Sequence, residues 1–64
     1  MKEYYRILKE RRIEKGLTQR ELADVLGVKD NAYSQYESGV RKMDAASFIK
    51  ICNVLDLQLS DFMD

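Results

Sequence analysis

One stretch of the chain, from Thr18 to Gly39, constrains the fold more than any other. It reads TQRELADVLGVKDNAYSQYESG and predicts two short helices joined by a tight turn at Gly27-Val28. Thr18 and Glu21 have the spacing of a capping box, in which a hydroxyl and a carboxylate each bind a free amide at a helix N-terminus. Gly39 then ends the second helix. Two helices held this closely can present one of their faces to a partner.

The second of these helices, residues 29–38, divides by side-chain chemistry. At about 100° per residue its polar side chains fall within an arc of roughly 140°, and its apolar and aromatic side chains fall on the other side. The polar face consists of Asp30, Asn31, Ser34, Gln35 and Ser38, and the opposite face of Ala32, Tyr33 and Tyr36. We expect such a helix to insert hydrogen-bonding side chains into a partner, and the major groove of DNA is the leading hypothesis.

The rest of the composition predicts a single all-α domain over residues 1–64. Proline is absent, and Leu, Lys, Glu, Arg and Ala are abundant. A single cysteine excludes an intrachain disulfide and suggests a reducing cytoplasm. No apolar run is long enough to span a membrane, and the N-terminal MKEYYRILKERR lacks the apolar core of a signal peptide.

Further helices are predicted at residues 4–15 and 45–55, with a last helical turn in residues 57–63. Gly16 has the position of a left-handed residue after the first helix, Asp44 that of an N-cap, and Asp56 that of a second left-handed residue. Lys2 is expected on a solvated face. Lys29 cannot accept an amide, so Asp30 or Asn31 is expected to cap the helix at 29–38. The expected buried side chains are Tyr4, Tyr5, Leu8, Ile13, Leu22, Ala23, Val25, Leu26, Val28, Ala45, Phe48, Ile51, Cys52 and Leu55, and Ile49 is expected to flank the last of these stripes.

Little in the chain suggests catalysis. There is no histidine, and the three glycines stand apart, so no phosphate-binding loop is present. Cys52 lies on an apolar helix face without a histidine to pair with, and we expect it to be a core residue. The acidic residues are scattered and show no metal-ligand spacing. We therefore expect no enzyme, no cofactor and no metal site.

The charge distribution gives mixed indications about a nucleic-acid partner. The net charge is zero, which counts against one. Residues 1–43 hold ten basic and seven acidic residues, however, whereas residues 44–64 hold one basic and four acidic. This asymmetry predicts one basic and one acidic face. The zero net charge keeps an alternative open: a protein–protein interaction module that binds another regulator.

Residues suited to phosphate and base contacts flank the polar face on both sides. Gln19 and Arg20 lie in the first turn of a helix, where free amides and the helix dipole attract phosphate. Asn31 and Gln35 are spaced i, i+4 and can pair with adenine edges, and Ser34 can contact a base or a phosphate. Asp30 fits less well because phosphates repel it, unless it accepts from cytosine or serves as the cap. The predicted DNA-contacting residues are Thr18, Gln19, Arg20, Lys29, Asp30, Asn31, Ser34, Gln35, Arg41 and Lys42.

With these residues in place, the chain resembles the Cro/repressor-type (Xre-like) helix-turn-helix domains of phage and bacterial regulators. The resemblance rests on Arg12, Gly16-Leu17-Thr18-Gln19, Leu22-Ala23, Leu26-Gly27-Val28, Ser34, Tyr36-Glu37, Gly39, Arg41-Lys42 and, more loosely, residues 57–62. Many relatives have Ser where Lys29 stands, Gly where Asp56 stands and Leu where Arg11 stands.

The resemblance implies a compact five-helix, lambda-repressor-like domain whose recognition helix is residues 29–38. It also implies that Gln19 contacts the DNA backbone and that Arg12 pairs with Glu37, which would relieve the cost of two charges near apolar surface. The implied function is a sequence-specific transcriptional regulator, expected to be a repressor, which binds DNA as a homodimer with recognition helices roughly 34 Å apart. Leu59, Phe62 and Met63 are the expected dimer surface, and the operator sequence does not follow from the resemblance.

Overall fold

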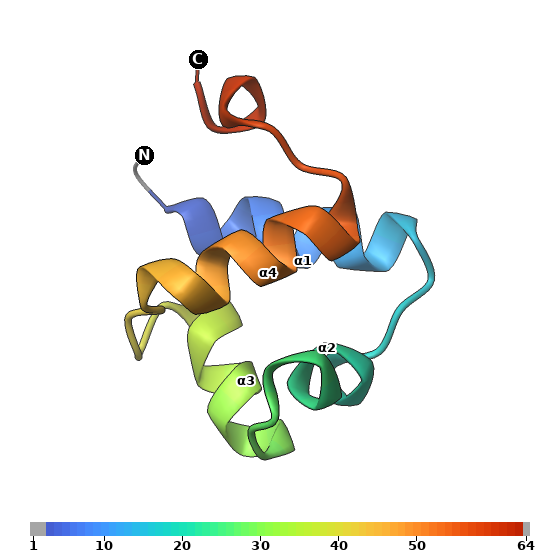
Figure 1. Cartoon of the computed structure of the whole chain (residues 1–64), viewed down its shortest axis with the longest axis vertical. Helices are drawn as coiled ribbons and strands as arrows, with labels where there is room; N and C mark the ends of the chain where they lie inside the picture. The colour runs from blue at the N-terminus through green and yellow to red at the C-terminus, as the bar shows by residue number, and fades with distance from the viewer. Residues whose placement is uncertain (1–2, 64) are drawn as a thin grey trace.

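A computed structural model describes residues 3–63, so Lys2 and Asp64 lie outside the described residues. Within that range the chain forms only helices, as predicted: α1 (Tyr4–Glu14), α2 (Gln19–Leu26), α3 (Asp30–Ser38), α4 (Ala45–Leu55) and a 3-10 turn, η1 (Leu59–Phe62). The fifth expected helix is thus a single 3-10 turn. In Figure 1, α1 and α4 cross the middle of the molecule, α2 and α3 lie at one end, and η1 lies at the other.

The helix ends at 18–39 form as the sequence predicts, with one exception. The Thr18 hydroxyl accepts from the amide of Glu21 at 3.0 Å, and the Glu21 carboxylate accepts from the amide of Thr18 at 2.8 Å. Gly27 ends α2 with a φ of 70°. The predicted cap of α3 by Asp30 or Asn31 is wrong: Lys29 occupies the cap position, and no side chain caps the helix there. Asp30 is already within the first helical turn, and its carboxylate turns toward α2 instead.

Gly39, which ends α3, is required by a close approach as well as by its backbone. Its φ is 82°, and a Cβ at this position would lie 2.6 Å from Cζ of the Tyr5 ring. A substituted residue would therefore clash with a side chain of α1 and be strained in its backbone. The end of α3 is fixed against α1 by this contact.

The core lies where all four helices meet. Its buried members are Leu8, Leu22, Ala23, Tyr33, Tyr36, Ile51, Leu55, Leu57 and Phe62. The inward positions predicted for Ile13, Val25 and Ala45 are wrong, because all three are exposed, and Ile49, expected to flank the buried stripe of α4, is exposed as well. The positions around the helix explain the exposure of the two isoleucines. At about 100° per residue, Ile13 points roughly 140° away from the buried Leu8, and Ile49 roughly 160° away from the buried Ile51. In α1, α2 and α4, only some of the apolar side chains are therefore buried in the core.

The end of α4 is fastened to α1 by basic side chains. Nη1 of Arg11 donates to the carbonyls of Leu55 at 3.0 Å and of Asp56 at 3.1 Å, and Nη2 lies 3.4 Å from Oδ1 of Asp61. Nζ of Lys15 lies 2.7 Å from Oδ2 of Asp56, which holds the pKa of that carboxyl below its usual value. Asp56 has the predicted left-handed conformation, with a φ of 55°.

These contacts change the expectation of one basic and one acidic face. Asp56 and Asp61, from the acidic last third of the chain, pair directly with Lys15 and Arg11 from the basic part. The acidic segment therefore neutralises charges of α1 rather than forming a separate face. The other described basic residues are divided equally: Arg20, Lys29, Arg41 and Lys42 lie in or beside α2 and α3, whereas Arg6, Lys9, Arg12 and Lys50 lie on α1 and α4.

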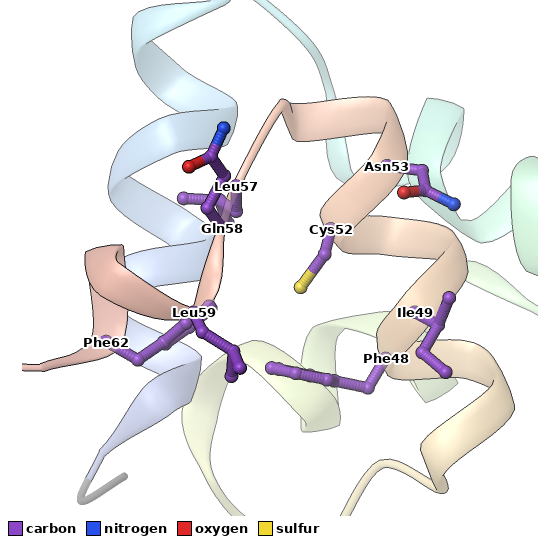
Figure 2. Close-up of a pocket in the computed structure, with 8 residues that line it drawn as sticks. All are labelled: Phe48, Ile49, Cys52, Asn53, Leu57, Gln58, Leu59 and Phe62. Carbon is purple, nitrogen blue, oxygen red and sulfur yellow. The ribbon is translucent and has the colours of Figure 1, made fainter.

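The C-terminal segment packs on α4 and leaves a shallow hollow between them. Phe62 is buried, and its ring centroid lies 5.3 Å from that of Phe48. The hollow has a volume of about 180 Å³. Figure 2 shows the sulfur of Cys52 pointing into it and the side chain of Leu59 pointing toward Phe48 across it. Phe62 is thus a core residue, and its prediction as an exposed part of a dimer surface is wrong, whereas Leu59 and Met63 are exposed.

Candidate nucleic-acid interface

Helix α3 turns its polar face outward, as the sequence predicts. Asp30, Asn31, Gln35 and Ser38 are exposed, and Ser34 is half-buried. Ser38 is less available than the others, because its hydroxyl donates to the carbonyl of Gln35 at 3.1 Å. The face available to a partner is therefore formed by the first and second turns of α3.

The opposite side of α3 anchors the helix in the core. Tyr33 is fully buried, Tyr36 is nearly so, and their rings meet edge to face at 6.2 Å. Burial, reinforced by the nearby carboxylate of Glu37, raises the pKa of Tyr33 well above its usual value. No hydrogen-bond partner for the Tyr33 hydroxyl lies among residues 3–63, so the ring rather than the hydroxyl accounts for its packing.

The predicted bridge between Arg12 and Glu37 is present and nearly closed to solvent. Nε of Arg12 lies 2.8 Å from Oε2 of Glu37, and only 12% and 2% of the two side chains are exposed. Nη1 of Arg12 also donates to the carbonyl of Leu17 at 2.8 Å. The bridge therefore links α1, the loop before α2, and α3, and it fixes the orientation of α3.

Glu37 also binds Gln19, one of the residues predicted to contact DNA. Nε2 of Gln19 donates to Oε1 of Glu37 at 3.1 Å. Both oxygens of the Glu37 carboxylate therefore accept a hydrogen bond, and Gln19 connects the start of α2 to the buried face of α3. Because the carboxylate can only accept, it fixes the nitrogen of the Gln19 amide inward.

The other predicted residues of α2 lie at its N-terminus. Thr18 is exposed, and its oxygen is engaged in the capping box. Arg20 is exposed, and its Nη1 lies 3.6 Å from Oδ2 of Asp30. The structure thus brings Arg20 onto the first turn of α3.

The remaining basic residues border the two ends of α3. Lys29 precedes the helix and is exposed. Arg41 and Lys42 follow it in an exposed loop, where the amide of Arg41 donates to the carbonyl of Gln35 at 3.2 Å. The Arg41 guanidinium lies 5.7 Å from the centre of the Tyr36 ring. Within residues 3–63, none of these three side chains forms an ion pair.

Comparison with known proteins agrees with this arrangement. A helix-turn-helix family model matches residues 8–62. The chain belongs to the helix-turn-helix family. This is a family of regulator domains rather than of enzymes, and the two helices of its motif here are α2 and α3.

Two curated relatives of the helix-turn-helix domain come from Bacillus subtilis (strain 168). One, the uncharacterized HTH-type transcriptional regulator YqaE, is 46% identical over 52 residues, which are 81% of this chain and 45% of the relative. The other, the SPbeta prophage-derived uncharacterized HTH-type transcriptional regulator YonR, is 36% identical over 56 residues, 88% of this chain and 51% of the relative. The chain thus spans about half the length of these relatives. No solved structure matches it significantly.

Three contacts of this helix-turn-helix domain were not predicted from the sequence: Gln19 with Glu37, Arg20 with Asp30, and Arg41 with Tyr36. The first two pairs join different helices, so the spacing of the residues along the chain does not reveal them. Arg20 and Asp30 do have opposite charges at adjacent ends of the two motif helices, and that feature could have suggested their pairing.

We also looked for a reactive cysteine, a metal site and a membrane-spanning helix. Cys52 packs against the core, as predicted, and burial raises the pKa of its thiol, which disfavours the reactive thiolate. Among residues 3–63, no group of three potential metal ligands is found, and no helix is long and apolar enough to cross a membrane.

Proposed function

We propose that this domain binds a defined sequence in double-stranded DNA and regulates transcription, as a repressor, with α3 in the major groove. The observation that carries the proposal is the division of α3. Its polar side chains are exposed in consecutive turns, and its other side is immobilised by buried tyrosines and by Glu37. A groove-reading helix needs that combination, because base recognition requires side chains held in a fixed register.

Each part of the interface has a role in this proposal. Asn31 and Gln35 pair with adenine edges, and Ser34 contacts a base or phosphate at the margin of the face. Gln19, with the free amides at the start of α2 near Thr18, binds a backbone phosphate. Lys29, Arg41 and Lys42 reach phosphates on either side of α3, which sets the register without reading sequence.

The relatives support the same function, since both are named as HTH-type transcriptional regulators. A chromosomal target places the domain in the cytoplasm of a bacterial cell, where its single thiol remains reduced. The function requires no cofactor, metal or catalytic residue, and we propose that the domain is not an enzyme.

We further propose that the domain binds DNA as a homodimer through its C-terminal end. Leu59 and Met63 are 72% and 71% exposed, and the exposed Ile49 lines the same α4 hollow as Leu59. This apolar surface lies at the end of the molecule opposite to α2 and α3 (Figure 1). Sedimentation velocity tests the proposal: Leu59→Asp should shift a dimer to monomer, and an unchanged dimer would exclude this surface.

A mobility-shift titration against a random-sequence duplex at low salt tests the DNA-binding proposal. Binding by the folded protein is expected, and its affinity should fall steeply as salt rises, because bound phosphates release counterions. Circular dichroism of the same sample confirms folding. A folded protein that fails to bind DNA at low salt would contradict the proposal. It would instead favour the alternative of a module that binds another regulator, which the zero net charge favours.

A further inference from the structure

We propose that Arg20 is a base-reading residue that selects guanine, and that Asp30 is the positioning residue that orients it. The inference rests on the proposed DNA binding and goes beyond it by naming a specificity determinant on α2. It replaces the simpler expectation that Arg20 binds a phosphate. It also gives a role to Asp30, whose charge otherwise fits poorly in a DNA interface.

The geometry places the Arg20 guanidinium over the recognition helix. Arg20 is the second residue of α2 and Asp30 the first of α3. Nη1 of Arg20 lies 3.6 Å from Oδ2 of Asp30, so the side chain reaches from α2 to the first turn of α3. Beyond Asp30, the exposed side chains of Asn31 and Gln35 continue along α3. Arg20 thus adds a guanidinium beside this polar face at the N-terminal end of α3.

The chemistry of the pair suits guanine. Guanidinium is planar and carries five N–H donors, so one nitrogen can bind Asp30 while the others remain free. The free donors match the O6 and N7 acceptors that guanine presents together in the major groove. A carboxylate beside the guanidinium restricts its rotation, so less conformational freedom is lost when the base is bound.

The pair also removes an electrostatic conflict. An isolated Asp30 on the groove-facing turn would repel the DNA phosphates, whereas Arg20 neutralises it at short range. Stability does not account for the contact: the two side chains are 74% and 57% exposed, and ion pairs this exposed contribute little to folding. Variants at either position should therefore fold normally, which makes their effect on DNA interpretable.

The test selects bound sites from a random DNA pool for the wild type and then compares variants on the selected site. The site should contain a guanine next to the bases read by Asn31 and Gln35. Arg20→Lys should reduce the preference for that guanine by about tenfold, because an ammonium cannot form the planar bidentate contact. Asp30→Asn should reduce the same preference while raising affinity for random duplex, since one negative charge is removed. Glu10→Gln, an exposed α1 variant with the same charge change, should leave the guanine preference unchanged.

Four results would overturn the inference, and they have different meanings. If Arg20→Lys and Asp30→Asn leave the preference intact, Arg20 does not read a base. If Asp30→Asn abolishes the preference at that G·C pair and Arg20→Lys does not, Asp30 itself reads the pair by accepting from cytosine, and Arg20 does not. If Arg20→Ala weakens all sequences equally, Arg20 binds a phosphate. Wild-type protein that binds no duplex at low salt would overturn the proposed function together with the inference.

Discussion

At the scale of single residues, Glu37 is the buried side chain that joins α1, α2 and α3. Its carboxylate accepts from Arg12 of α1 and from Gln19 of α2 while the residue itself belongs to α3. The bridge to Arg12 could be predicted, because the family pattern and the cost of a lone buried charge both point to it. The bond to Gln19 could not, since a glutamine at a helix N-terminus is equally compatible with a solvent-facing side chain.

Replacing Glu37 by alanine should destabilise the domain by about 3–5 kcal/mol, because Arg12 would remain buried without its partner. Urea denaturation followed by circular dichroism measures this loss. Glu10→Ala on the exposed side of α1 is the matched control and should change the unfolding free energy by no more than about 0.5 kcal/mol. Stability of Glu37→Ala close to that of the wild type would show that the bridge does not hold α1 to α3.

At the scale of elements, the ends of the helices were easier to predict than their buried faces. Caps such as the Thr18–Glu21 box depend on short-range spacing, and they formed as predicted. The faces depend on where neighbouring helices lie, and a helix of eight to eleven residues contacts them over a narrow stripe. Ile13 and Ile49 are apolar but exposed, so the apolar pattern alone overestimated the core.

The composition did not suggest that Arg11 and Lys15 would bind the end of α4. Arg11 binds the carbonyls of Leu55 and Asp56, where a helix has acceptors without intrahelical partners. We expect Arg11→Met to lower stability by about 1–2 kcal/mol, since these bonds have a charged donor and are partly exposed. It should also speed amide exchange selectively in residues 57–62.

Lys9→Met, at an exposed position of the same helix, serves as the control for Arg11→Met. It removes an equal charge and adds the same side chain without touching α4. Urea denaturation midpoints and amide hydrogen exchange in residues 57–62 are compared between the two variants. Equal stabilities and equal exchange in residues 57–62 would mean that Arg11 is an ordinary surface residue.

At the scale of the whole molecule, the two proposed interfaces lie at opposite ends. Helices α2 and α3 occupy one end, the apolar surface at Leu59 and Met63 the other, and α1 and α4 connect them (Figure 1). The fold class and the motif could be predicted because they follow from caps, turns and periodicity. The pairing of the acidic C-terminal segment with α1 could not, because a charge total does not say which residues meet in space.

The central claim is that α3 reads DNA sequence, and two alanine variants test it most directly. On the site selected from a random pool, Gln35→Ala should lose about 1–3 kcal/mol of discrimination at one base and leave binding to random duplex nearly unchanged. Lys42→Ala should weaken binding to both duplexes alike and reduce the salt slope by about 1. If the two variants weaken both duplexes to the same extent, α3 does not read sequence and the account is contradicted.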